Sequence, residues 1–323
     1  MDTQATDALA QLSDAMAARV AGAAGLVVAV RPQGGRDLGR RDQGGHPRSF
    51  VLWREGVAVG SEQTLPEAEA YEAVLPGGAT VAARLAGRDP GTNVVALRLD
   101  AAPGASPGTS PGASSGTPLP EAAEVRVGAL ALALGTDGAG GVVARLGLVR
   151  EAGPAWQSQA GGRVDRRIVL DLRLGGADEG GPVLAGSGGL LGFSASGPRR
   201  RTLVIPAATV ERVLGPLLDR GSVARGWLGV SLQPVAVPEA LRGAAGAEAG
   251  LMVLGLAEGA PAAAAGVMPG DILVTLDGAA IARARALAER LGPESVGRVA
   301  ELRLLRAGGA LTLPVTVTAR PER

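Results

Sequence analysis

The sequence contains no cysteine and no lysine, and its 323 residues include only six aromatic side chains and a single histidine. The lack of cysteine excludes disulfides, thiolate nucleophiles and thiolate metal ligands, although it does not identify the compartment. All positive charge therefore comes from arginine, and the net charge of +1 provides no long-range field that would attract nucleic acid or an anionic membrane. With so few aromatic rings, we expect a core of valine, leucine, isoleucine and alanine.

The N-terminal residues also lack the pattern of an export signal. They carry acidic side chains early and no basic start followed by an apolar run. The apolar stretch GAAGLVVAV is too short to span a bilayer. These features predict a cytoplasmic protein without a membrane span.

The first two thirds of the chain show an N-terminal helix followed by many short strands. Apolar residues at helical spacing within 7–21 (Leu9, Leu12, Met16 and Val20) predict an amphipathic helix, which we assign to residues 1–24. Short apolar runs separated by glycine and proline follow, and they are typical of a barrel or sandwich over 25–221. Residues 101–120 are rich in proline, glycine and serine and predict a disordered insert. The domain ends with a predicted helix over 207–220 that Gly221 terminates.

A second unit is predicted over 222–323. Its pattern indicates a small β domain with two helices, a short one that ends at Gly266 and a longer one over 282–292. The turn MPGD separates the first helix from the strand ILVTLDG. We therefore expect an α+β domain attached to a mainly β domain.

Several phrases of the sequence occur in an order that points to a known family. The first domain contains LAGRDPGTNVVALRL, VRVGALALALG, DEGGPVL and VIPAATVERVL, and the second contains RGWLGV and GAPAAAAGVMPGDILVTLDGAAI. The first four resemble segments of the protease domain of the HtrA family, the DegP-like serine proteases, and the last two closely resemble its PDZ domain. The resemblance runs from about residue 8 to the C-terminus, without the 101–120 insert. It implies a mainly β fold, with a trypsin-like double β-barrel followed by an α+β PDZ domain.

The same resemblance places substitutions at all three positions of the catalytic triad. Gln63 stands at the position of the catalytic histidine, Asn93 at that of the aspartate, and Glu179 at that of the serine. A serine nucleophile needs an adjacent base, and the base needs an orienting partner. The amide of Gln63 accepts no proton at neutral pH and Asn93 carries no charge, so no catalytic residue is intact. The prediction is a pseudoprotease, in which Glu179 either accepts hydrogen bonds from the amides of its own loop and plugs the site or points to solvent.

Other residues offer weaker alternatives for chemistry. The only histidine, His46, lies beside a proline and is expected to be an exposed loop residue. The loose acidic set does not predict a metal site, and we expect no cofactor. That acidic set comprises Asp165, Asp171, Asp178 and Glu179. The remaining candidate hydroxyls are expected in turns or strands, and they are Ser49, Ser61, Ser187, Ser194 and Ser196.

The PDZ resemblance implies a peptide-binding groove. Such domains add an extended C-terminal peptide to a sheet edge and hold its carboxylate on consecutive backbone N–H groups. The turn that matches is Trp227-Leu228-Gly229-Val230, and the predicted helix around Ile281–Leu291 forms the opposite wall. Ala284, Leu287 and Leu291 share one face of that helix. With Leu228 and Val230 they would line an apolar pocket, although Leu287 is equally compatible with an ordinary core and Leu291 fits an ordinary core better.

The leading hypothesis is therefore an inactive HtrA-like protein that binds peptides or unfolded proteins with free C-termini and acts as an adaptor or in protein quality control. It would form a homo-oligomer (a trimer in relatives) or pair with an active relative, and it would not bind nucleic acid. Two alternatives stay open. One is an active HtrA-type serine endopeptidase, and the other is a structural or oligomerisation module whose groove is closed. Relatives are often periplasmic, in contrast to the location predicted from the N-terminus.

Overall fold

The computed structural model describes residues 3–33, 46–101, 124–158 and 160–320, which form two compact units, Met1–Ser222 and Val223–Arg323. The insert predicted over 101–120 lies, apart from its first residue, outside the described residues. The mainly β fold, with two closed barrels followed by a smaller α+β unit, is confirmed.

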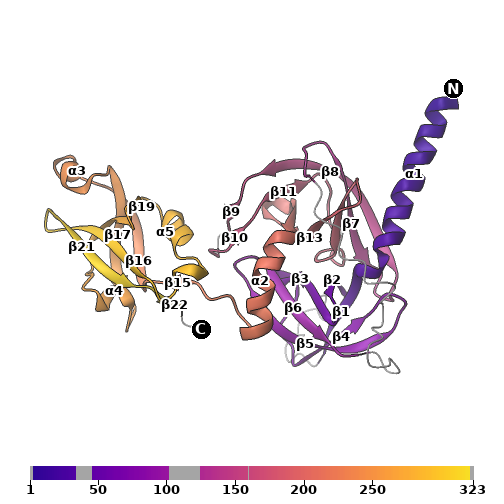
Figure 1. Ribbon diagram of the computed structural model, residues 1–323, viewed down its shortest axis with the longest axis horizontal. Coiled ribbons are helices and arrows are strands. Elements are labelled where there is room, and N and C mark those ends of the chain that lie inside the picture. The colour runs from indigo at the N-terminus through magenta and orange to yellow at the C-terminus, as the bar shows by residue number, and fades with distance from the viewer. Residues whose placement is uncertain (1–2, 34–45, 102–123, 159, 321–323) are drawn as a thin grey trace. The chain divides into compact units, whose positions relative to one another are not determined.

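The first unit consists of two closed antiparallel barrels (Figure 1), ordered β1-β2-β3-β6-β5-β4 and β11-β14-β13-β12-β7-β8. The strands of the first barrel are β1 (Val27–Gln33), β2 (Arg48–Arg54), β3 (Val57–Ser61), β4 (Ala70–Val74), β5 (Thr80–Asp89) and β6 (Val94–Leu99). Those of the second are β7 (Leu130–Thr136), β8 (Val142–Gly153), β11 (Arg167–Leu170), β12 (Pro182–Ala185), β13 (Leu190–Ser196) and β14 (Thr202–Pro206). A hairpin and three single 3₁₀ turns accompany them: β9 (Trp156–Gln157), β10 (Arg163–Val164), η1 (Ala24–Leu26), η2 (Glu62–Thr64) and η3 (Pro198–Arg200).

The barrel interiors are filled mainly by aliphatic side chains, as expected from the shortage of aromatic residues. Phe50 is the main exception. Its ring is fully buried in the first barrel, and a Cβ on Gly60 would lie 2.8 Å from it. Glycine at this position therefore makes room for the ring of Phe50, because interiors are packed too densely to accept both groups.

Two long helices belong to the first unit. Helix α2 (Ala207–Arg220) has the predicted bounds, and Gly221 ends it in the left-handed conformation at φ +75°. Helix α1 (Thr3–Ala23) extends away from the barrels (Figure 1). Its predicted apolar face is not buried, because Leu9 is 69% and Leu12 44% exposed. None of the helices among the described residues has the length and apolar character needed to cross a bilayer.

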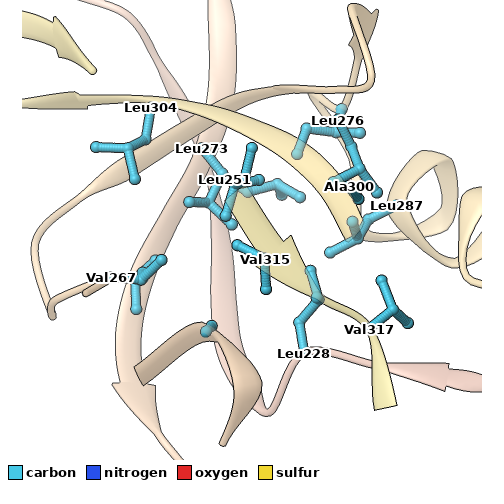
Figure 2. Close-up of a cluster of buried hydrophobic side chains, with 14 residues drawn as sticks. Leu228, Leu251, Val267, Leu273, Leu276, Leu287, Ala300, Leu304, Val315 and Val317 are labelled. Carbon is cyan, nitrogen blue, oxygen red and sulfur yellow. The ribbon is translucent and has the colours of Figure 1, made fainter. Parts of the chain in front are cut away.

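The second unit is built on a sheet of six strands in the order β16-β17-β18-β20-β21, with β19 paired to β18. Strands β16 and β21 are its two edges. A cluster of aliphatic side chains packs against the sheet (Figure 2). Leu251, Leu273 and Leu304 are fully buried, and Leu228 and Leu287 are almost fully buried. The strands are β15 (Gly226–Trp227), β16 (Val230–Ala236), β17 (Ala249–Leu256), β18 (Ile272–Leu276), β19 (Ala279–Ala280), β20 (Val299–Arg306), β21 (Gly309–Thr316) and β22 (Thr318–Ala319).

The helices of this unit differ in part from the prediction. Helix α4 (Pro261–Ala264) is followed by Gly266 in the left-handed region, as expected. Helix α5 covers only Ala284–Arg290, which is shorter than predicted, and η4 (Pro293–Ser295) follows it. Helix α3 (Glu239–Ala245) was not predicted, because its seven residues are too few to show a clear apolar period.

Candidate functional site

The three positions predicted from the triad come together between the two barrels of the first unit. Gln63 lies in η2, directly after β3, and Asn93 precedes β6 with a left-handed φ of +59°. Glu179 lies in the loop between β11 and β12. Segments more than a hundred residues apart in the chain therefore supply one polar cluster.

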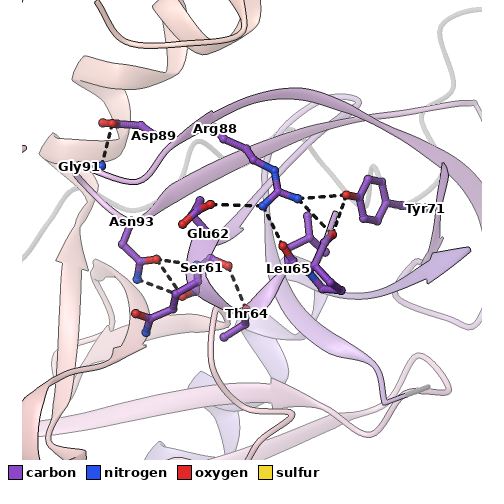
Figure 3. A network of polar contacts seen from close by, with 11 residues as sticks. Ser61, Glu62, Thr64, Leu65, Tyr71, Arg88, Asp89, Gly91 and Asn93 are labelled. Atoms are coloured by element: carbon purple, nitrogen blue, oxygen red, sulfur yellow. Dashed lines mark hydrogen bonds and ion pairs between the residues drawn. The ribbon is translucent and has the colours of Figure 1, made fainter. Parts of the chain in front are cut away.

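Hydrogen bonds connect all three side chains, and Ser61 links Asn93 to Glu179 (Figure 3 shows the part around Ser61 and Asn93). Asn93 Nδ2 donates to Ser61 Oγ at 3.0 Å, and Ser61 Oγ donates to Glu179 Oε1 at 2.9 Å. The backbone N–H of Gln63 donates to Asn93 Oδ1 at 2.9 Å. The side-chain amide of Gln63 donates to Glu179 Oε1 and also to the carbonyl of Ser196, the latter at 2.9 Å. Both protons of this amide are thus engaged.

The orientation of Glu179 differs from both expectations. Its side chain is buried, with 7% of the residue exposed, so it does not point to solvent. Its carboxylate accepts hydrogen bonds from the side chains of Ser61 and Gln63 on the first barrel, not from the amides of its own loop. The prediction placed the donors wrongly because they come from a distant part of the chain.

The loop that carries Glu179 is held from both barrels. Its Asp178 carboxylate accepts from the backbone N–H of Gly175 at 2.7 Å and pairs with Arg145 on β8. From the first barrel, Ser49 Oγ donates to the carbonyl of Ala177 at 2.5 Å. Gly180 has φ +96°, and a Cβ there would lie 2.2 Å from the carbonyl oxygen of Ser49. The loop is therefore closely fitted between the barrels.

A second polar network fixes the segment that presents Gln63 (Figure 3). Arg88 on β5 donates to the carbonyl of Leu65 at 2.8 Å and to the hydroxyl of Tyr71 at 3.1 Å, and it pairs with Glu62 at 3.3 Å. Glu62 is the neighbour of Gln63 in η2. The guanidinium therefore ties both ends of this turn to β5, which restricts where the amide of Gln63 can lie.

Within the described ranges, no histidine accompanies the serine hydroxyls of this centre. The single histidine, His46, is exposed, and none of the hydrogen bonds of the described residues involves it. Ser61 is 0% exposed, so its hydroxyl has no access to a substrate. Ser49 and Ser194 donate their hydroxyls to carbonyls of the Glu179 loop, at Ala177 and Asp178. The arrangement connects the two barrels, and the carboxylate that accepts from Ser61 is buried together with it.

The acidic residues considered as a loose set do not converge. Asp165 accepts from Arg212 and Thr209 near the start of α2, and Asp178 pairs with Arg145. Within the described ranges, no group of three or more histidine, aspartate or glutamate side chains is arranged to hold a metal ion.

Replacing Glu179 should show how much this cluster stabilises the first unit. We expect Glu179→Ala to lower the free energy of unfolding by about 1–3 kcal/mol, because the buried hydroxyl of Ser61 and the amide of Gln63 lose their shared acceptor. Glu179→Gln keeps an acceptor oxygen at the same place and should cost less. Urea unfolding followed by Trp53 and Trp156 fluorescence in a Trp227→Phe background would measure both. Equal stability of Glu179→Ala and the parent would contradict a structural role for the carboxylate.

The turn predicted to hold a peptide carboxylate has a left-handed backbone conformation that suits glycine. Gly229 has φ +71°, and a Cβ there would lie 2.4 Å from the Cβ of Ala260 and 2.9 Å from the ring of Trp227. The carbonyl of Leu228 accepts from the N–H of Ala262 at 3.1 Å, and that of Gly229 accepts from Ala257 at 2.8 Å. Both peptide bonds are trans. Since the N–H and C=O of a trans peptide point in opposite directions, the N–H groups of Gly229 and Val230 point away from these donors.

The predicted opposite wall is only partly as expected. Leu287 is buried and Leu291 packs against the same core cluster, so both contribute to the core. Leu228 is likewise in the core, while Val230 packs against it and is partly exposed. Ala284, the first residue of α5, is exposed. The wall beside β16 is therefore formed by a short helix whose apolar side chains continue from the core.

Comparison with known proteins agrees with this architecture. The sequence profile of the PDZ domain matches residues 226–317. A probable periplasmic serine endoprotease, DegP-like, of Brucella suis biovar 1 (strain 1330) is 30% identical over 300 residues, which cover 89% of this chain and 56% of that protein. The chain is therefore similar to DegP-like serine endoproteases over most of its length, and it contains a PDZ domain. A protein with the same name in Rhizobium meliloti (strain 1021) is 28% identical over 298 residues.

Solved HtrA structures share the fold of most of this chain. An HtrA-type protease, AlgW with decapeptide, superposes with a TM-score of 0.71 at 22% identity and covers 94% of this chain and 98% of its own. The serine endoprotease from Yersinia pestis gives a TM-score of 0.70 at 21% identity, with coverage of 94% and 97%. At this identity, the likeness establishes the fold. The chain spans little more than half the length of the DegP-like relatives it matches.

The predicted cytoplasmic location is wrong. The relatives are named periplasmic serine endoproteases, which points to a periplasmic location. The prediction relied on the N-terminal residues alone, and the similarity over 300 residues is the stronger observation.

Proposed function

We propose that this HtrA-like protein does not hydrolyse peptide bonds and that it binds the free C-termini of peptides or unfolded proteins through its PDZ domain. The observation that carries the first part is the hydrogen-bonded cluster of Gln63, Ser61 and Glu179. The amide of Gln63 stands at the position that aligns with the base, the carboxylate of Glu179 stands at that of the nucleophile, and the two are hydrogen-bonded to each other. The side-chain amide of Gln63 also donates a hydrogen bond to the carbonyl of Ser196.

The binding part is supported by the turn before β16. The N–H groups of Gly229 and Val230 point away from the carbonyl contacts to Ala262 and Ala257. Consecutive N–H groups of this kind form an anion site suited to a carboxylate. The partly buried side chains of Val230 and Leu232, beside Leu287 and Leu291, would receive apolar ligand side chains.

The second candidate function is proteolysis, which the names of the relatives favour. Two assays on the full chain separate the candidates. A fluorophosphonate probe should not label the protein, and unfolded casein should stay intact, because three triad groups are replaced and loss of such groups costs about 10⁴–10⁶ in rate. Labelling that one Ser→Ala substitution abolishes would establish an active protease.

Binding is tested by comparing each peptide with its C-terminal amide. We expect peptides with a free carboxylate to bind and their amides to bind at least about tenfold more weakly, because the amide cannot form charge-assisted hydrogen bonds with the turn. Fluorescence polarisation with labelled library peptides measures both. Equal binding of the two forms, or none, would favour a structural module with a closed groove.

A further inference from the structure

The unpaired edge of β16 exposes backbone groups in a defined alternation. The carbonyl of Gly229 accepts from Ala257, next to β17, so the N–H of Val230 points to the open edge. Two residues later, Leu232 is paired in register with Val253, whose N–H and C=O bond to Asp271 and Gly270 on the other side. The backbone of Leu232 therefore also faces the open edge, since residues of an antiparallel ladder alternate.

The next residue in this alternation is Pro234. It lies in the middle of β16, pairs in register with Leu251 and is exposed. Because Val230 and Leu232 face the open edge, Pro234 does so too. Proline has no N–H, so the edge has no donor at this position, which is where sheets tolerate proline.

We propose, on the basis of the peptide-binding function above, that Pro234 limits backbone recognition to about the last four residues of the ligand. A peptide added antiparallel to β16 from the turn would lie opposite Val230, Ser231, Leu232 and Gln233. The fifth residue from its C-terminus would meet Pro234 and find no N–H for its carbonyl. The ligand class is therefore a short C-terminal tail, and residues farther upstream add little affinity.

The opposite edge of the sheet provides a matched control. Strand β21 also carries an exposed proline in its interior, Pro314, which pairs in register with Glu301. Strand β21 is separated from β17 by β18 and β20, so it forms the edge of the sheet opposite to β16. A substitution at Pro314 restores an edge N–H of the same kind without touching the edge where the peptide would add.

The test uses the full chain and the tightest-binding octapeptide from a random C-terminal library, shortened from its N-terminus to seven, six, five, four and three residues. Affinity measured by fluorescence polarisation should fall steeply from four to three residues and change by less than about twofold between four and eight. In Pro234→Ala, the six- and eight-residue peptides should bind about two- to tenfold more tightly, as one added hydrogen bond allows, while the four-residue peptide is unchanged. Pro314→Ala should behave as the parent protein.

The outcomes distinguish this inference from the function on which it rests. A library without any carboxylate-dependent binder would overturn the proposed peptide binding. Binding that strengthens steadily up to eight residues in the parent protein would leave that function intact and overturn the length limit. An unchanged affinity of the long peptides for Pro234→Ala would also overturn it, and the length series of the parent does not depend on how the variant folds.

Discussion

Gly229→Ala should weaken the binding of carboxylate-terminated peptides roughly hundredfold. The new Cβ would lie 2.4 Å from that of Ala260 and 2.9 Å from the ring of Trp227, and both are shorter than any normal contact. A residue with a Cβ also disfavours the φ of +71° found here. The turn must therefore change shape, and the N–H groups of residues 229 and 230 would no longer point to one place. Each hydrogen bond to a charged group contributes about 1.5–3 kcal/mol, so the lower value for two bonds, about 3 kcal/mol, gives the expected factor.

Gly255→Ala is the control for this substitution. Gly255 lies on β17 opposite Ser231, and a Cβ added there would meet no atom within 4 Å. Peptide affinity should stay within about twofold of the parent. Circular dichroism checks that both variants are folded. If Gly229→Ala binds as the parent does, the carboxylate is held elsewhere and the turn is only a structural element.

The sequence allowed the fold to be predicted because its local signals agree with the final structure. Short apolar runs between glycines predicted a barrel or sandwich, and the resemblance to the HtrA family implied the two barrels that the structure has. Helix α2 ends at Gly221 as its pattern indicates. The bounds of α5 were harder to predict. Arg283 is extended, with φ −138°, although the residues around it are good helix formers. The neighbouring Ile281 is fully buried, so tertiary packing overrides the local helix propensity here.

The candidate catalytic centre could be located from the sequence, but its internal contacts could not. Aligned phrases placed Gln63, Asn93 and Glu179, and the structure brings them together. Ser61 was expected to be an ordinary turn or strand residue, yet it is the link between Asn93 and Glu179. Its partners are 32 and 118 residues away in the chain. No local pattern carries such a contact, and a serine at the end of a strand gives no signal of its own.

The resemblance also cannot decide what a replaced triad does instead. A glutamate at position 179 could point to solvent or fill the site. Which of the two occurs depends on whether hydrogen-bond donors lie close to its carboxylate. Here those donors are Ser61 and Gln63, and the loop is fitted to the first barrel through Ser49. Groups at the aligned catalytic positions thus contribute to the contact between barrels. On the proposed function, the same residues would combine a loss of chemistry with a structural contact between the barrels.

The largest expected loss of stability comes from Arg306→Met in the second unit. Asp271 is 2% exposed, and its carboxylate accepts from Arg306 Nε at 2.9 Å, from Arg306 Nη2 at 2.7 Å and from the N–H of Met268 at 2.8 Å. Removing the arginine leaves this carboxylate buried with one donor. Breaking a buried pair costs about 3–5 kcal/mol, and we expect about 3 because the side chain of Arg306 is 30% exposed and partly screened. The exposed pair Arg285–Glu289 on α5 is the control, and Arg285→Met should cost at most about 0.5 kcal/mol.

The pH dependence of this loss identifies its cause. Burial alone would raise the pKa of Asp271, but the hydrogen bonds from Arg306 and Met268 and the positive charge of Arg306 outweigh it and lower that pKa. A carboxyl whose pKa is lower in the folded state stabilises the fold above its unfolded pKa of about 3.9, and this contribution is lost as the pH falls through the folded value. In Arg306→Met, burial acts without the arginine, so the carboxyl takes up a proton more readily. The stability difference between parent and variant should therefore shrink from pH 7 to pH 3. Hydrogen exchange of peptides covering β17 and β18 measures it, and a difference that stays constant with pH would show that lost packing, not the buried charge, is responsible.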